Sequence, residues 1–144
     1  MKYDSKETIG YLTKKTHNSL CCLLSKTFVK NGIILPHSQF IILIKLYDED
    51  GQTQQELAGK LMLDKAAIKR TVDNLIKHGF VSRSPGKRNN KILLTLKGRR
   101  MEKKIKSIAL AATAEALGNI KPKDFETCKT VLKKLIENVN ILCA

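Results

Sequence analysis

The sequence predicts a mainly α-helical fold that contains one small β-hairpin. Over most of the chain, apolar residues recur at spacings of three and four, which is typical of amphipathic helices. The period changes only after Gly79, where two short β-type runs, FVSRS and KILLTL, flank the turn-forming segment PGKRNN. No repeat or low-complexity tract interrupts the 144 residues, so we expect one domain spanning residues 1–144.

Two helices are predicted in the first third of the chain. The first covers residues 5–30, and Asn31-Gly32 is a typical stop signal after it. The second begins near Pro36, a residue suited to the first helical turn, and ends at the acidic turn DEDG.

Two short helices then follow almost end to end. Thr53 and Glu56 have the spacing of a capping box, in which each side chain satisfies the other residue's backbone N–H. Asp64 is a favourable N-cap for the next helix, which should end at Gly79. Only Leu61, Met62 and Leu63 separate the two helices.

The second of these helices carries positive charge near its beginning. Lys65, Lys69 and Arg70 lie in its first two turns, where the helix dipole disfavours cations. The expected reason is an anionic partner outside the protein.

Two further helices are predicted after the hairpin. The first starts after Thr95 and ends at Gly118-Asn119, and the second starts at Pro122. The last helix repeats apolar residues over two heptads, at Phe125, Cys128, Leu132, Leu135, Val139 and Leu142. Such a seam is long enough to pack against another helix.

The charge of the chain points to an anionic partner as well. There are 27 Lys+Arg against 13 Asp+Glu, a net charge of +14, and the pI is about 9.8. Residues 52–100 hold twelve of the cations and only three acids. This excess suits nucleic acid or an anionic membrane surface. The longest apolar runs, LCCLL and FIILI, are too short to span a membrane and no signal segment is evident, so we expect a cytoplasmic protein without a membrane partner.

The order of the elements is that of a winged helix-turn-helix. A recognition helix in the major groove presents its N-terminal residues to bases and phosphates, so cations there meet double-stranded DNA instead of water. We therefore expect a DNA-binding winged helix over residues 35–96, with helices in 5–32 and 97–144 that form a homodimer. The candidate DNA contacts are Gln54, Gln55, Lys65, Ala66, Lys69, Arg70, Asn74, Lys87, Arg88 and Lys91.

Four segments follow one another in a familiar order: LPHSQFIILIKL, TQQELAGKL, IKRTVDNLIKHGFVSR and KILLTLKGR. In these segments the chain resembles the MarR family (multiple-antibiotic-resistance regulators), which are dimeric bacterial winged-helix repressors. The resemblance implies a homodimeric transcriptional regulator that binds a pseudo-palindromic operator. It also implies a small-molecule effector that enters a crevice lined by the first, second and fifth helices and releases the DNA.

The chain departs from the family pattern at two places. Family members usually carry hydroxyl residues at the start of the recognition helix, where this chain has Ala66 and Ala67, so the hydrogen bonds of those hydroxyls are lost. In the wing, Gly86 stands where the family commonly has an Asp two residues before an Arg. Arg88 therefore lacks its usual carboxylate brace.

Alternative functions find less support. The net charge alone would permit a constitutive, weakly specific architectural DNA-binding protein, but that class would favour an asymmetric basic tail, which the chain lacks. No HExxH, GxGxxG or Walker motif and no recognisable nucleophile motif is present, so we expect no enzymatic activity and no cofactor.

The thiols leave one further alternative open. Cys21 and Cys22 are adjacent and face different directions on a helix, which disfavours a mutual disulfide, yet they could sense oxidants as thiols do in some MarR relatives. Cys128 lies on the apolar seam and is expected to be a buried, unreactive thiol. His17 and Cys21 are one helical turn apart and would make half of a metal site; because no second pair is evident, no metal is expected.

Overall fold

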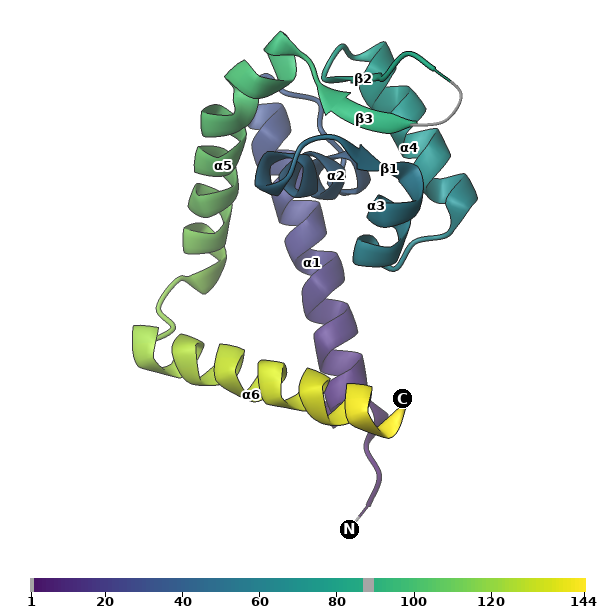
Figure 1. Cartoon of the computed structure of the whole chain (residues 1–144). Coiled ribbons are helices and arrows are strands. Elements are labelled where there is room, and N and C mark those ends of the chain that lie inside the picture. Colours follow the sequence, from purple (N-terminus) through teal and green to yellow (C-terminus); the bar gives the residue numbers. More distant parts are fainter. Residues whose placement is uncertain (1, 87–89) are drawn as a thin grey trace. The chain divides into compact units, whose positions relative to one another are not determined.

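The computed structural model describes residues 2–86 and 90–144 and confirms the mainly helical fold (Figure 1). A short 3-10 turn, Ser5–Glu7, precedes the first α-helix. The remaining elements are α1 (Ile9–Lys30), α2 (His37–Asp48), β1 (Gln52–Thr53), α3 (Gln54–Leu61), α4 (Lys65–Lys77), β2 (Val81–Arg83), β3 (Lys91–Leu94), α5 (Leu96–Leu117) and α6 (Pro122–Leu142). Among these residues no helix is long and apolar enough to cross a membrane.

The chain divides into two compact units, Met1–Thr113 and Ala114–Ala144. The first unit contains the sheet, helices α1 to α4 and most of α5, and the second contains α6. The hydrophobic core lies in the first unit, where every helix and the sheet contribute to it. Its fully buried side chains are Phe28, Leu35, Ile42, Leu43, Leu46, Leu57, Ile68, Val72, Leu75, Ile92 and Ile105.

The sheet has one strand more than the predicted hairpin. Strand β3 pairs antiparallel with β2, with Val81 opposite Leu94, and on its other edge with β1, with Gln52 opposite Ile92 (Figure 1). A strand of two residues is too short to show an alternating pattern, so β1 is recognisable only from its pairing.

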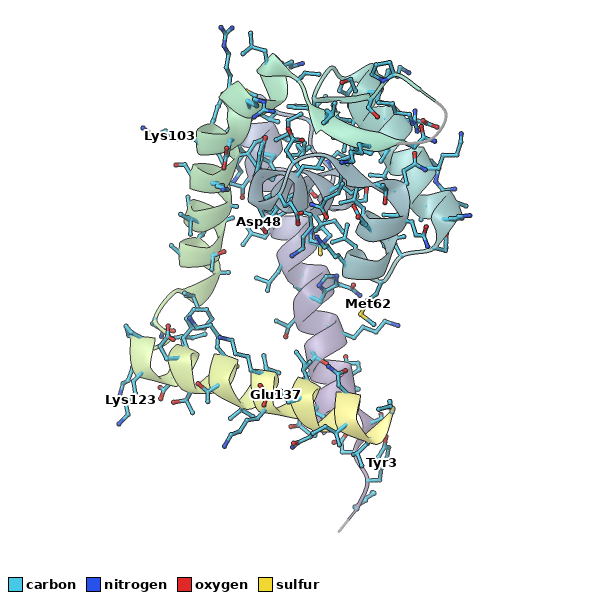
Figure 2. The ribbon with its side chains drawn as sticks, viewed as in Figure 1. Tyr3, Asp48, Met62, Lys103, Lys123 and Glu137 are labelled. Atoms are coloured by element: carbon cyan, nitrogen blue, oxygen red, sulfur yellow. The ribbon has the colours of Figure 1, made fainter. Side chains whose placement is uncertain are left out.

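The helix caps follow the sequence closely. Thr53 and Glu56 form the predicted capping box: the Thr53 N–H donates to the Glu56 carboxylate at 2.9 Å, and the Glu56 N–H donates to Thr53 Oγ1 at 3.1 Å. Asp64 caps α4 by accepting the Ala67 N–H at 2.7 Å. Between the two helices Met62 adopts a left-handed backbone with φ 54°, and its side chain projects into solvent (Figure 2).

The start of α5 packs closely against the residues that follow the end of α4. Gly98 packs against the carbonyl of Phe80 so closely that a Cβ at this position would collide with it. The Thr95 hydroxyl accepts the Gly98 N–H at 3.1 Å, and Tyr47 donates its O–H to the Gly98 carbonyl at 2.8 Å. Burial, with a smaller contribution from the charge of Glu102, raises the pKa of Tyr47 to about 12, which keeps this phenol a neutral donor.

Candidate nucleic-acid interface

Helix α4 has two faces of opposite character. Ile68, Val72 and Leu75 are fully buried in the core of the first unit. At 100° per residue Ala66, Arg70 and Asn74 lie on the opposite face, and Lys65 and Lys69 lie on the flank of the stripe; the structure leaves all five side chains exposed. Because the buried stripe fixes the rotation of the helix, these predicted contact residues are all available to an external partner.

An ionic brace ties α4 to the wing and to α3. The Arg83 guanidinium on β2 donates to Asp73 Oδ1 at 2.7 Å and to Gln54 Oε1 at 2.9 and 3.3 Å. Lys69 also pairs with Asp73, at 3.2 Å. The hydrogen bond from Arg83, followed by that from Lys69, holds the pKa of Asp73 below its usual value. The carboxylate therefore stays charged and keeps the two cations in place.

Arg83 is a residue that sequence reasoning did not select as a site residue. No period or motif links Arg83 to Asp73 or to Gln54, which lie on different elements. The contact also changes the expected role of Gln54: its amide oxygen orients Arg83, so the side chain is half-buried rather than fully free for DNA. Gln55 next to it is exposed.

The wing is described only in part. Lys91 is exposed at the start of β3. Its backbone N–H donates to Ser84 Oγ at 3.2 Å, and its carbonyl accepts the Ser84 N–H at 2.9 Å. Lys87 and Arg88 lie outside the described residues. Their contacts with DNA remain predictions from the sequence.

The far end of α4 is attached to α2 and α5. His78 Nδ1 lies 3.4 Å from Oε1 of the buried Gln39 on α2. The Lys97 ammonium donates to the His78 carbonyl at 2.7 Å and lies 4.9 Å from the centre of the Phe80 ring. Helix α4 is thus held along its buried face, at Asp73 and at its C-terminal end.

Comparisons with known proteins agree with this geometry. The family model of the MarR family matches residues 35–93, from α2 to β3. The HTH-type transcriptional regulator YybA of Bacillus subtilis is 25% identical over 108 residues, which cover 73% of this chain and 72% of YybA. A MarR transcriptional regulator from Methanosarcina mazei has a solved structure with a TM-score of 0.83 and 25% identity, and the match covers 97% of this chain and 94% of that one.

The chain is similar to the MarR family over residues 35–93 and has the fold of MarR regulators over nearly its whole length. It is a DNA-binding winged helix-turn-helix transcriptional regulator, and the proteins that it matches are transcriptional regulators and not enzymes. A second solved relative, a MarR-family protein of Mycobacterium tuberculosis in complex with p-aminosalicylic acid, is 26% identical. Its TM-score is 0.71, and the match covers 89% of this chain and 98% of that one.

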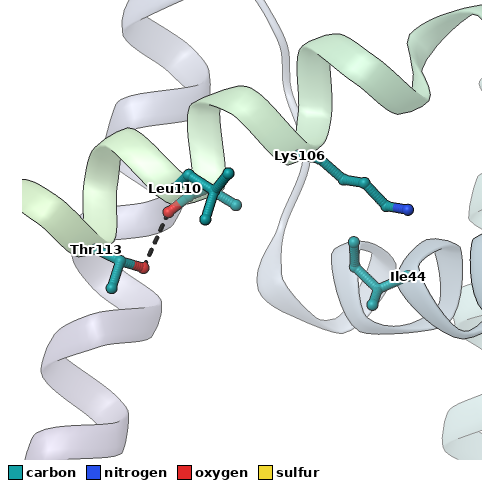
Figure 3. A pocket seen from close by; sticks show the side chains of 5 residues that line it. Ile44, Lys106, Leu110 and Thr113 are labelled. Carbon is teal, nitrogen blue, oxygen red and sulfur yellow. Dashed lines mark hydrogen bonds between the residues drawn. The ribbon is translucent and has the colours of Figure 1, made fainter. Parts of the chain in front are cut away.

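This regulator has a groove between α2 and α5. Its volume is about 270 Å³, and it is lined by Ile44, Lys106, Ala109, Leu110 and Thr113 (Figure 3). The Lys106 ammonium is the charged group of this lining; it pairs with Glu102 at 2.6 Å and lies 5.6 Å from the centre of the Tyr47 ring. The family resemblance implied a crevice lined by the first, second and fifth helices, whereas the residues that line this groove come from α2 and α5.

The four cysteines of the regulator are free thiols. Cys21 is half-buried, and Cys22 beside it is exposed, as is Cys143. Cys128, for which we expected burial, is exposed in the single chain because no other element of its unit covers the seam of α6. An oxidant-sensing role of Cys21 and Cys22 stays a prediction.

Proposed function

We propose that this regulator is a homodimer that represses transcription by occupying a pseudo-palindromic operator. The observation that carries the proposal is the exposed surface of α4, where Arg70 and Asn74 lie opposite a fully buried apolar stripe and Lys65 and Lys69 lie on its flank. A helix anchored in this way can enter the major groove with these four side chains toward the base edges and phosphates.

The side chains of this face divide into two roles. Arg70 and Asn74 suit base edges, because guanidinium and amide groups can make bidentate hydrogen bonds with guanine and adenine. Lys65 suits phosphate, and so do Gln55 and the wing residue Lys91 together with Lys87 and Arg88. Ala66 offers only a methyl group, which suits close approach to a thymine methyl.

Dimerisation is supported by α6. Its apolar side chains are exposed in the single chain, at Val131, Leu135, Ile136, Val139, Ile141 and Leu142. A helix with so much uncovered apolar surface gains stability from a second helix, and a two-fold pair of chains would bring two copies of α4 to successive turns of DNA. Half-sites about 34–36 Å apart are expected for such a dimer.

The groove between α2 and α5 supports a small anionic effector. Its volume is below the roughly 300–1,000 Å³ that drug-sized ligands occupy, so a single-ring acid is a suitable size. Lys106 could exchange Glu102 for the carboxylate of the ligand, while Ile44, Ala109 and Leu110 contact its ring. The p-aminosalicylic acid bound by the Mycobacterium tuberculosis relative belongs to this chemical class.

Selection of bound fragments from genomic DNA tests the central proposal. A sequence-specific dimer should recover a small set of fragments that share an inverted repeat, and footprinting should protect two half-sites. Many unrelated fragments bound with similar affinity would support the constitutive architectural protein instead, and the repressor proposal would have to be given up.

The effector is tested on the operator so identified. p-Aminosalicylate should weaken operator binding in fluorescence anisotropy, and Lys106→Ala should reduce that response. Lys103→Ala is the matched control, because Lys103 is exposed on the same helix and does not line the groove (Figure 2). An equal response from both variants would exclude Lys106 as the carboxylate partner.

A further inference from the structure

Three metal-binding side chains meet between α1 and α2. His17 and Cys21 lie one turn apart on α1, and His37 is the first residue of α2. Cys21 Sγ is 3.5 Å from His17 Nε2, and the His17 and His37 rings meet edge to face with centroids 5.4 Å apart. One ligand atom from each residue lies within 4.8 Å of the other two. Within residues 2–86 and 90–144, this is the one such group of His, Cys, Asp or Glu side chains.

One ring nitrogen of His37 has no hydrogen-bond partner within the described parts of the chain. Among the described side chains, its Nδ1 is the buried nitrogen or oxygen that has no hydrogen-bond partner. A neutral imidazole presents a nitrogen lone pair that can coordinate a metal ion. Phe40 packs 6.2 Å from the His37 ring and limits its rotation. A buried polar atom without a partner is costly, and a bound ion would remove that cost.

The donor set fits Zn²⁺. Two imidazoles and one thiolate are ligands that this ion prefers, and three protein ligands leave one tetrahedral position open. With Zn–N and Zn–S distances of about 2.0–2.3 Å, ligand atoms in a tetrahedron lie roughly 3.3–3.8 Å apart. The Cys21–His17 pair already has such a spacing, and His37 needs only a small side-chain movement to complete the set.

We propose that His17, Cys21 and His37 bind one Zn²⁺ ion per chain, with water or an anionic ligand at the fourth position. Coordination displaces the proton of the Cys21 thiol: the S–H bond breaks, a Zn–S bond forms, and the proton passes to solvent. Helical spacing in the sequence identified only His17 and Cys21 as candidate ligands. His37 lies sixteen positions beyond Cys21 and comes close to them because α2 packs on α1.

The ion would link α1 to the beginning of α2. Two residues further along α2, the buried Gln39 reaches His78 at the end of the recognition helix. Metal binding at the folded site should therefore stabilise the unit that contains α4, because an ion that binds only the native state shifts unfolding by mass action. This inference does not depend on the identity of the operator or of the effector.

Cobalt(II) is the direct probe, because its absorption reports thiolate ligation. The full-length protein, first stripped with a chelator under reducing conditions, should take up one Co²⁺ per chain and develop a thiolate-to-cobalt charge-transfer band. One equivalent of Zn²⁺ should remove the band, and the melting temperature should rise when Zn²⁺ is added. A protein that develops no such band, or binds several ions without it, would overturn the proposal.

Substitutions assign the ligands. Cys21→Ser should abolish the charge-transfer band and weaken Zn²⁺ binding by more than about 100-fold, beyond the 10–100-fold that outer-sphere changes typically cost. The matched control is Cys22→Ser, the exposed neighbouring thiol, which should keep the band unchanged. His17→Gln affects an exposed side chain and tests the site without risk to the core, while His37→Gln tests the half-buried ligand with circular dichroism as a check of folding. Unchanged binding by Cys21→Ser or by His17→Gln would show that the ion is held elsewhere.

Discussion

Helices α4 and α6 look alike in sequence but differ in what covers them. Both have an apolar stripe and a face rich in lysine. In α4 the stripe of Ile68, Val72 and Leu75 is completely buried in the core of its own unit. In α6, which the structure describes in full, no residue is buried, and side chains such as Leu135 and Val139 are exposed.

The difference shows what an amphipathic pattern means. The pattern predicts that a helix has one face suited to burial, but it does not identify the surface that buries it. For α4 that surface belongs to the same chain, so its cationic face is oriented by packing. For α6 we propose that the surface belongs to a second copy of the chain. The predictions below test this contrast, in order of decreasing effect.

The largest effect is expected from charges on the seam of α6. Leu135→Glu combined with Val139→Glu would place four carboxylates in a two-fold interface, so we expect a monomer in place of the dimer. Multi-angle light scattering measures this directly, and the thermal transition of the first unit checks that the chain still folds. The double substitution Lys133→Glu with Lys134→Glu is the control, because both lysines lie on the exposed polar face of the same helix. If the protein with the seam substitutions is still a dimer, the apolar seam of α6 is not the dimer interface, and the proposed contrast between α4 and α6 is wrong.

The second-largest effect is expected from the buried apolar stripe of α4. Leu75 is fully buried, so Leu75→Ala should lower the free energy of unfolding by about 2–5 kcal/mol through lost apolar contact and the cavity left behind. Urea denaturation followed by circular dichroism gives the value. The equivalent truncation Ile141→Ala on α6, where the side chain is 75% exposed, should cost far less when measured on the monomeric seam variant. Similar losses at both positions would mean that α6 has a core of its own.

The exposed face of α4 should govern affinity for DNA. Arg70→Ala is expected to cost about 1–3 kcal/mol on the operator and much less on random duplexes, because a base-reading guanidinium loses its bidentate hydrogen bonds. Fluorescence anisotropy with operator and scrambled DNA at several salt concentrations measures both losses. Arg70 pairs with no acid in the described ion pairs, so its removal should leave the helix intact.

Lys91→Ala is the companion measurement for the phosphate contacts of the wing. It should weaken binding to both duplexes alike and reduce the salt slope by about one unit. If Arg70→Ala behaves in the same way as Lys91→Ala, Arg70 contacts phosphate and sequence recognition lies elsewhere on α4.

The smallest effect concerns the brace between α4 and the wing. Since the pKa of Asp73 is depressed in the folded protein, its contribution to stability is present above its ordinary value of 3.8 and is lost as the pH falls through the lower, folded value. Asp73→Asn should therefore reduce stability at neutral pH, and the difference from the parent protein should vanish in strong acid. Unfolding in urea between pH 2 and pH 7 tests this. A difference that persists at the acid limit would assign the effect to packing and not to the charge of Asp73.

Several local features were predicted correctly from the residues alone. The capping box of Thr53 and Glu56, the Asp64 cap and the rotation of α4 all depend on residues within two helical turns of one another. Such features follow from hydrogen-bond geometry and helical period, which are readable in any single sequence. The family resemblance carried by the segments from α2 to β3 is likewise a property of the sequence, and the comparisons confirm it.

Other features depend on residues that only the fold brings together. Strand β1 exists because β3 offers it an edge, and Arg83 meets Asp73 and Gln54 because β2 turns back along α4 and α3. The exposure of Cys128 follows from the absence of a covering element around α6 in the described chain. None of these relations has a fixed spacing in the sequence.

The sequence by itself thus determined the helical fold, the winged helix-turn-helix order and the helix that carries exposed cations, because these depend on local period, capping and charge. The tertiary structure alone decided which carboxylate braces the wing, which side chains line the groove between α2 and α5, and that His37 joins His17 and Cys21. The physical reason is that burial and packing bring distant residues within a few ångströms of one another. Separation along the chain carries no information about such pairs.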